Sequence, residues 1–351
     1  MQTILKKVDI DNIDSNIIKE ASKLLQEGNM VAFPTETVYG LGANALDAEA
    51  SHKIYEAKGR PSDNPLIVHV ADRRQILPLV TGIPKKAELL MEAFWPGPLT
   101  LIFKKSDIVP KGTTGGLDTV AIRMPNHKVA LALIETADIP IAAPSANTSG
   151  RPSPTRAEHV MEDLQGRISM VLDGGEVGIG IESTIVDVTS EIPMILRPGY
   201  ITKKMLEDVV GTVTIDPAIS GPLKQDVRPK APGMKYKHYA PKADFKMFDG
   251  EMEKVTKRIN ELAKDYIEQG YKVGIIASHE TVSQYQYGEV VEIGSRLDEI
   301  TISRNLYRVL REFDDRNVDY ILGETFGSEE LGQAIMNRLL KAAGYQVENV
   351  R

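Results

Sequence analysis

The stretch that decides the fold is residues 31–70, VAFPTETVYGLGANALDAEASHKIYEAKGRPSDNPLIVHV. It opens with one apolar strand candidate, Val31–Phe33, and closes with another, Leu66–Val70, and a helical segment lies between them. Hydroxyl, cationic, amide and imidazole side chains gather near the ends of these two strand candidates. Loops at strand ends are where α/β folds place their ligand chemistry, so we expect a functional site here.

Length and composition describe an ordinary soluble protein with more than one domain. The chain has 351 residues, 42% hydrophobic and 26% charged, which favours two domains with sizeable cores. The formal net charge of -7 provides no global attraction to nucleic acid or anionic membrane, although a local basic patch stays open.

Cysteine and hydropathy patterns exclude several classes of site. The chain has no cysteine, which excludes disulfides, zinc-thiolate sites and cysteine nucleophiles. No apolar run approaches the ~18 residues of a membrane helix, and the first residues do not resemble a signal peptide. We therefore expect a cytoplasmic protein without a membrane partner.

Alternating apolar runs and helical segments predict an α/β or α+β first domain with a mixed sheet. The strand candidates lie around Ile4 and at 31–33, 66–70, 99–103, 119–124, 139–143, 170–172, 184–188 and 194–196. Helices are expected from about Ser15 to Gly28, at 47–57 and at 84–94.

The composition changes after the first domain. Residues 217–241 carry five prolines and several basic side chains, which indicates a semi-extended linker. Beyond it, strand candidates at 245–248, 273–277, 290–293 and 320–322 alternate with helices at 251–269, 296–313 and 329–343, which predicts a parallel sheet covered by helices. We expect domains at 1–210 and 244–351, joined by a linker or lid at 211–243.

Lys58-Gly59-Arg60, with Asn64 nearby, is the strongest cationic cluster of the first domain. Two cations beside a glycine suit phosphate oxygens, because charge is neutralised without steric crowding. The alternative is a solvated helix end, where cations complement the helix dipole. These residues alone leave both interpretations open.

Three other features suggest ligand contacts. The loop Pro144–Gly150 presents hydroxyls and an amide that suit phosphate or ribose oxygens, although such loops are usually plain turns. Arg123 lies inside an apolar strand candidate and therefore needs an anionic partner, from the protein or from a ligand. His69 also lies in an apolar run, where a hydrogen-bonded core histidine is the alternative.

Two nucleotide-binding patterns are rejected. Gly40–Ala45 fits the loose dinucleotide fingerprint G-x-G-x-x-A, but Pro34–Thr37 intervenes after the strand and the expected acidic residue is missing. The phosphate-binding pattern G-x-x-x-x-G-K-[ST] is absent. The linker segment Ala231–Pro241 combines tyrosines, a histidine and lysines, which favours a docking role over a basic spacer.

Taken together, these segments resemble the threonylcarbamoyl-AMP synthase family, the YrdC type in its long form with an extra C-terminal domain. The motifs that carry the resemblance occur in the family's order over nearly the whole chain: 34–41, 58–61, 64–66, 95–98, 120–123, 144–147, 182–184, 196–199 and the linker segment 232–241. The resemblance implies a twisted mixed α/β sheet around a concave basic cavity, followed by a smaller Rossmann-like parallel α/β domain.

The resemblance also implies a reaction. L-threonine, bicarbonate or CO2, and ATP give L-threonylcarbamoyladenylate and pyrophosphate, for threonylcarbamoyladenosine formation in tRNA. Mg2+ would enter with ATP, and no protein metal site is implied. The expected partners are these substrates, with handover to the tRNA threonylcarbamoyl transferase complex and weak RNA binding as further candidates.

Residue roles follow from the same resemblance. The implied catalytic residues, which neutralise or orient the phosphates, are Lys58, Arg60, Ser145 and Asn147. The residues implied to hold L-threonine are Thr37, His69, Arg123, Ala143 through its backbone, and Ser183. The residues implied to contact ATP are Arg60, Asn64, Thr119, Ser145, Ser153, Arg197 and Tyr236, the last as part of a lid.

Two other functions are compatible with parts of the sequence. A non-catalytic RNA-binding module would use the basic cavity and linker on tRNA directly, and the acidic net charge argues against it. A carbamoyltransferase that uses carbamoyl-adenylate would need further catalytic domains, and the C-terminal region shows no second active-site motif.

Overall fold

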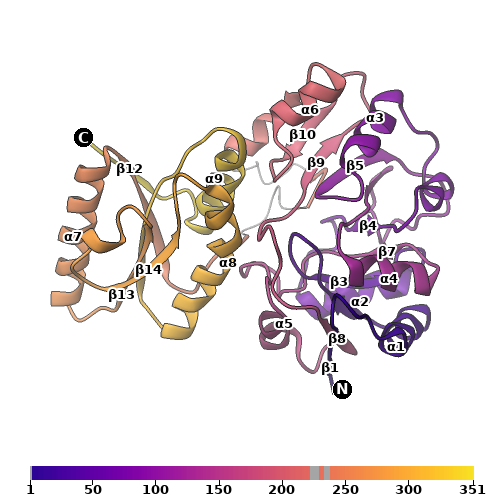
Figure 1. Ribbon diagram of the computed structural model, residues 1–351, viewed down its shortest axis with the longest axis horizontal. Helices are drawn as coiled ribbons and strands as arrows, with labels where there is room; N and C mark the ends of the chain where they lie inside the picture. Colours follow the sequence, from indigo (N-terminus) through magenta and orange to yellow (C-terminus); the bar gives the residue numbers. More distant parts are fainter. Residues whose placement is uncertain (1, 222–228, 233–237) are drawn as a thin grey trace. The chain divides into compact units, whose positions relative to one another are not determined.

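The computed structural model describes residues 2–221, 229–232 and 238–351 and divides the chain into two compact units. The first unit comprises Met1–Ser149 and Ser153–Lys235, and the second comprises Gly150–Pro152 and Tyr236–Arg351. Figure 1 labels the elements of both units.

The first unit contains a mixed sheet, as expected. Its strands are β1 (Ile4–Lys7), β2 (Val31–Phe33), β3 (Gly40–Asn44), β4 (Ile67–His69), β5 (Leu99–Lys104), β6 (Thr119–Arg123), β7 (Ile141–Ala142), β8 (Met170–Asp173), β9 (Thr184–Asp187), β10 (Met194–Arg197) and β11 (Thr214–Ile215). Their order in the sheet is β1-β8-β2-β3-β7-β4-β6-β5-β9-β10-β11. Parallel and antiparallel pairs alternate irregularly: β4 pairs parallel to β6, whereas β5 pairs antiparallel to β6.

Helices cover both faces of this sheet. They are α1 (Ser15–Gln26), α2 (Ala48–Lys58), α3 (Lys85–Phe94), α4 (Lys128–Ala137), α5 (Ala157–Leu164) and α6 (Lys203–Val210), with 3-10 turns η1 (Arg73–Leu79) and η2 (Pro217–Ser220). Successive side chains of a strand point to opposite faces. Accordingly Val31 and Phe33 join the core that contains α1 and α4, and Ala32 joins the core that contains α2 and α3.

The second unit has a five-stranded sheet in which every pairing is parallel, as the alternating pattern predicts. Its elements are β12 (Asp244–Gly250), α7 (Met252–Glu268), β13 (Val273–Ser278), η3 (Val282–Gln284), β14 (Glu289–Gly294), α8 (Glu299–Arg316), β15 (Tyr320–Glu324), α9 (Glu330–Ala342) and β16 (Val347–Val350). Helix α7 covers one face of the sheet, and α8 and α9 cover the other (Figure 1).

Two features differ from the expected domain plan. The beginning of the expected linker is part of the first sheet, because Thr214–Ile215 pairs parallel to β10. The short segment Gly150–Pro152 belongs to the second unit, where Arg311 Nη2 donates to the Pro152 carbonyl at 2.7 Å. Neither feature has a sequence pattern, since each depends on contacts between residues distant in the chain.

Candidate functional site

One hydroxyl shapes the turn that follows β2. Thr35 Oγ1 accepts hydrogen bonds from the backbone N–H groups of Thr37, at 3.1 Å, and Val38, at 3.3 Å, and it donates to the Val38 carbonyl at 2.7 Å. Threonine side chains stabilise tight turns through such bonds to the backbone. From the other side, Ile179 N donates to the Glu36 carbonyl at 2.9 Å, so the backbone that carries Glu36 and Thr37 is held from two directions.

Arg123 ends β6 and is buried beside this turn. Its Nη1 donates to Thr37 Oγ1 at 2.9 Å, and its Nε donates to the Gly97 carbonyl at 3.3 Å. Its Nη2 lies 2.7 Å from Glu36 Oε2, an ion pair in which both side chains are largely buried. The anionic partner that the sequence required for Arg123 is therefore supplied within the chain by Glu36, a residue that was not among the predicted site residues.

Ser183 and Arg197 join the same polar cluster through a threonine that sequence reasoning missed. Thr100 lies opposite Arg123 in the β5–β6 pair, and its Oγ1 is 2.8 Å from Ser183 Oγ. Arg197 donates from Nε to the Ser183 carbonyl at 3.0 Å and from Nη2 to Ser183 Oγ at 3.1 Å. The only available signal for Thr100 was a hydroxyl inside the apolar run of β5.

His69 lies opposite Arg123 on the neighbouring strand β4, and it is buried. Its Nδ1 is 3.1 Å from the Ile67 carbonyl. Burial, reinforced by the positive charge of Arg123, lowers the pKa of His69 to about 3. The imidazole is therefore neutral at physiological pH and acts there as a hydrogen-bonding group without charge.

Lys58 connects the end of α2 to the loop after β7. Its Nζ donates to the Ser145 carbonyl at 2.6 Å and also to the Asn147 carbonyl. Within the loop, Ser145 Oγ donates to Asn147 Oδ1 at 2.6 Å. Gly59 ends the helix in the left-handed conformation with φ of 60°, which glycine adopts without strain. Lys58 is only 3% exposed, so the alternative of a solvated helix end is wrong.

Arg60 and Asn64 form a second buried group nearby in the chain. Arg60 donates from Nε to the Asn64 carbonyl at 3.2 Å and from Nη2 to the Pro65 carbonyl at 3.0 Å. Asn64 Oδ1 is buried and accepts no hydrogen bond from the described residues. Buried polar atoms are usually hydrogen-bonded, so this amide oxygen is available to a ligand.

The structure gives fewer contacts for the remaining predicted site residues. Ala143 is buried after β7, with its N–H donating to the Ile67 carbonyl at 2.8 Å, and Ser153 Oγ donates to Glu182 Oε1 at 2.6 Å. Thr119 starts β6, at the opposite end of the strand from Arg123. Tyr236 lies outside the described residues, and the concave basic cavity stays a prediction.

The rejection of the dinucleotide fingerprint is confirmed. Gly40–Asn44 forms strand β3, which pairs antiparallel to β2 and β7, and it is not a phosphate-binding loop. A Cβ on Gly42 would lie 2.8 Å from Phe33 and Ile141 side chain atoms, so this glycine permits close packing between neighbouring strands.

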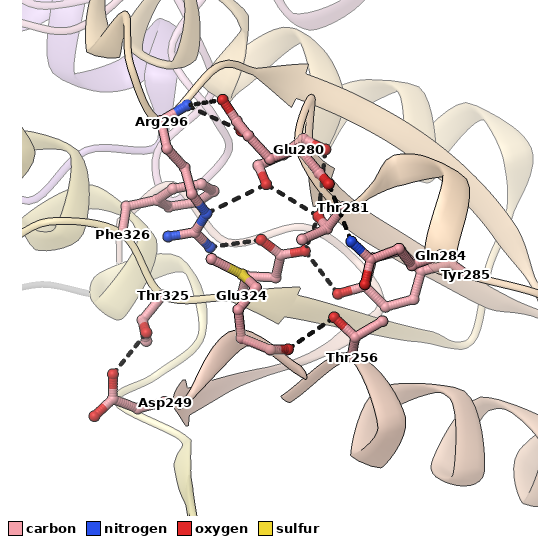
Figure 2. A network of polar contacts seen from close by, with 12 residues as sticks. Asp249, Thr256, Glu280, Thr281, Gln284, Tyr285, Arg296, Glu324, Thr325 and Phe326 are labelled. Carbon is pink, nitrogen blue, oxygen red and sulfur yellow. Dashed lines mark hydrogen bonds and ion pairs between the residues drawn. The ribbon is translucent and has the colours of Figure 1, made fainter. Parts of the chain in front are cut away.

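The second unit contains its own arginine–glutamate pair, with a buried carboxylate and a partly exposed guanidinium, which Figure 2 shows in detail. Glu324 ends β15 and is 1% exposed, and its Oε2 lies 2.5 Å from Arg296 Nη2. Glu324 Oε1 accepts hydrogen bonds from Tyr285 OH, at 2.7 Å, and from Thr281 Oγ1. Burial, together with the charge of Glu324, raises the pKa of Tyr285, so its hydroxyl remains a donor.

Other contacts complete this network and link the ends of three parallel strands. Arg296 Nε donates to Ser278 Oγ at 3.2 Å, and its guanidinium carbon lies 4.7 Å from the centre of the Phe326 ring. Every oxygen of Glu324 is thus bonded within the protein. We interpret this network as a structural link between β13, β14 and β15.

Neither a cluster of metal-binding side chains nor a membrane-spanning helix occurs within the described ranges. No three histidine or acidic side chains of residues 2–221, 229–232 and 238–351 are grouped so as to hold a metal ion. In the same residues, no helix combines the length and the apolar character needed to cross a membrane.

Comparison with known proteins covers the whole chain. Residues 23–199 match the family described as "Telomere recombination" (Sua5, YciO and YrdC), and residues 201–344 match the family described as "Threonylcarbamoyl-AMP synthase, C-terminal domain". The chain is 51% identical to a threonylcarbamoyl-AMP synthase of Pyrococcus abyssi, over 97% of this chain and 98% of that protein. It is also 51% identical to the threonylcarbamoyl-AMP synthase of Bacillus subtilis, over 94% of each protein.

A solved structure agrees with these matches. The crystal structure of P. abyssi Sua5 complexed with L-threonine superposes with a TM-score of 0.94 at 49% identity, over 99% of this chain and 100% of that one. Fold, sequence family and near full-length relatives therefore agree, and the chain belongs to the threonylcarbamoyl-AMP synthase family in its two-domain form.

Proposed function

We propose that this protein makes L-threonylcarbamoyl-AMP and pyrophosphate from L-threonine, bicarbonate or CO2, and ATP. The observation that carries the proposal is a set of four buried cations in the first unit: Lys58, Arg60, Arg123 and Arg197, each no more than 9% exposed. A site that gathers several cations suits anionic substrates. The substrates of this reaction carry an amino-acid carboxylate, a carbamate and a triphosphate.

The proposed threonine site is centred on Arg123. Its guanidinium pairs with the substrate carboxylate, since arginine and carboxylate geometry match. Thr37, Ser183 and the backbone of Ala143 surround the amino acid, and neutral His69 adds a hydrogen-bonding group without adding charge. The contacts of Arg123 with Thr37, and of Ser183 with Thr100 opposite Arg123, support this grouping.

The proposed nucleotide site uses the remaining predicted residues. Lys58 and Arg60 neutralise the phosphates, Ser145 and Asn147 orient the α-phosphate or the nucleoside, and the unbonded Asn64 oxygen accepts a hydrogen bond from the nucleotide. Further contacts with ATP come from Thr119, Ser153, Arg197 and Tyr236, with the segment around Tyr236 as a lid. The Lys58 bonds to the carbonyls of Ser145 and Asn147 support a shared site.

Catalysis in such a site consists mainly of positioning and charge neutralisation. The bound ammonium group of threonine first releases a proton to solvent, and the neutral amine then attacks CO2 and releases a second proton to give a carbamate anion. A carbamate oxygen attacks the α-phosphorus of ATP, and pyrophosphate leaves. Two anions must meet in this step, so buried cations lower the barrier. Mg2+ would enter with the triphosphate and help to neutralise its charge.

The product then passes to the machinery that modifies tRNA, by release or by direct handover to the tRNA threonylcarbamoyl transferase complex. A direct, weak contact with RNA is a secondary proposal, which predicts salt-sensitive binding. The experiment that tests the main proposal is pyrophosphate release from ATP by the purified full chain. Release should require both L-threonine and bicarbonate, and release that is independent of threonine would contradict the proposal.

A further inference from the structure

The partner of Arg123 is unusual for a buried carboxylate. Glu36 Oε1 and Oε2 are both inaccessible to solvent, and neither accepts a hydrogen bond from the described residues. Within the described part of the chain, the Glu36 carboxylate forms an ion pair with Arg123 Nη2 at 2.7 Å, and that nitrogen donates no hydrogen bond there. A buried carboxylate normally accepts several hydrogen bonds, because losing water is otherwise uncompensated.

The backbone on each side of Glu36 is firmly held, so this incomplete bonding is not due to a loose turn. Ile179 N donates to the Glu36 carbonyl and Gly180 N donates to the Thr37 carbonyl, at 2.9 and 3.1 Å. The Thr35 hydroxyl fixes the turn from within. The fold therefore holds a carboxylate beside a guanidinium without satisfying either group completely.

An α-amino acid carries the complementary charges. The carboxylate of the amino acid can pair with Arg123. Its ammonium group lies two bonds away and can donate three hydrogen bonds, and the Glu36 carboxylate accepts none from the described residues. We propose that Glu36 is the counter-ion of the substrate α-ammonium group, so that Arg123 and Glu36 together select a zwitterion. This inference rests on the proposed function, because it assigns Glu36 a role in the threonine site.

A structural ion pair would predict something different. If Glu36 served only to neutralise Arg123, its removal would change the affinity of every ligand that uses Arg123 to a similar extent. If it binds the ammonium group, its removal weakens only ligands that carry this group. The two roles are separated by ligands that lack one charge of threonine.

The test measures dissociation constants by calorimetry for the wild-type chain and for Glu36→Gln, which keeps the shape of the side chain and removes its charge. The ligands are L-threonine, (R)-3-hydroxybutyrate, which lacks the amine, and (R)-1-aminopropan-2-ol, which lacks the carboxylate. The wild type should prefer threonine to 3-hydroxybutyrate at least tenfold. In Glu36→Gln this preference should fall about tenfold or more, since an ion-paired hydrogen bond is worth about 1.5–3 kcal/mol.

Controls make each outcome decisive. Glu176→Gln removes an exposed carboxylate that pairs with Arg156 and should leave the preference unchanged. Arg123→Gln should remove the preference for threonine over 1-aminopropan-2-ol. If Glu36→Gln does not fold, Glu36→Asp provides the test, because it keeps the charge beside Arg123 but its side chain is one methylene shorter. The preference for threonine should then fall severalfold, whereas a structural ion pair predicts an unchanged preference.

Contrary results are equally clear. An unchanged preference in Glu36→Gln, a parallel loss for all ligands, or a wild type that binds 3-hydroxybutyrate as tightly as threonine would overturn the inference. Failure of the proposed function looks different, because the wild type would then show no threonine-dependent pyrophosphate release whatever the variants bind.

Discussion

Each unit of the protein contains an arginine–glutamate pair with a buried carboxylate at the ends of its strands, and the two pairs are bonded very differently. Glu324 of the second unit accepts from Thr281, Tyr285 and Arg296. The Glu36 carboxylate of the first unit forms an ion pair with Arg123 and accepts no hydrogen bond from the described residues. A carboxylate whose oxygens both accept hydrogen bonds within the protein is saturated and does not bind a ligand, whereas a carboxylate that accepts none can still do so. The comparison indicates that charge burial alone does not identify a site, and that incomplete bonding is the more informative sign.

The largest expected difference between the pairs is in stability. Glu324→Gln should lower the free energy of unfolding of the second unit by about 2–4 kcal/mol, because the buried Thr281 and Tyr285 hydroxyls lose an ionised acceptor and the partly exposed Arg296 loses its ion pair. Glu36→Gln should cost the first unit less, about 1–2 kcal/mol, because the loss of the ion pair with buried Arg123 is offset by removal of a buried carboxylate that accepts no hydrogen bond from the described residues. Hydrogen exchange of β15 amides follows the second unit, and fluorescence of Trp95, the one tryptophan, follows the first. Equal costs would mean that both pairs are structural.

A somewhat smaller effect is expected on substrate binding. Arg123→Ala should raise the KM for threonine about 100-fold, close to 2.7 kcal/mol, with little change in the KM for ATP. Arg296→Ala removes the equivalent side chain of the second pair and serves as the matched control, with both KM values expected to stay as in the wild type. Pyrophosphate release at varied threonine and ATP measures both. Similar changes for the two substrates in Arg123→Ala would refute the assignment of Arg123 to threonine.

The smallest effect concerns the histidine beside Arg123. The pKa of His69 is lowered to about 3 in the folded protein, so below its unfolded pKa of about 6.5 the unfolded chain binds a proton that the folded one does not. Stability from the neutral imidazole is therefore complete above about pH 6.5 and is lost as the pH falls, by up to about 2 kcal/mol at pH 5.

His69→Gln should flatten this pH dependence, measured by urea unfolding with Trp95 fluorescence between pH 7 and 5. His127 also has a pKa lowered by burial, with the charge of Glu36 opposing the shift, and it contributes in the same direction in both proteins. The difference between wild type and variant isolates His69. An identical slope in both would show that His69 accepts a proton in the folded state.

Much of the sheet was predictable because its strands are short apolar runs. The runs at 31–33, 99–103 and 119–124 correspond to β2, β5 and β6, with ends within one residue. Strand β3 was missed since two of its five residues are glycines, which are depleted in strands. Helix α4 and strand β16 were also missed, and in each case packing against distant residues determines the structure.

The candidate site was predictable only in part, for a related reason. The position of Arg123 in an apolar strand predicted an anionic partner. Nothing in the local sequence indicated that this partner is Glu36, which lies 87 residues earlier in the chain. Thr100 was also not predicted as a site residue, because its role depends on lying opposite Arg123 in an antiparallel strand pair. Lys58 and Arg60 were identified as cations, and the structure added that they are buried.

The amino-acid sequence by itself determined the family, the two α/β units and the types of side chain available for chemistry, because ordered motifs and apolar periodicity are written locally in the chain. Only the tertiary structure decided which carboxylate is left incompletely bonded and which is saturated. That difference arises from strand register and from turns that bring distant residues within 3 Å of each other, and such distances are not encoded in any single segment.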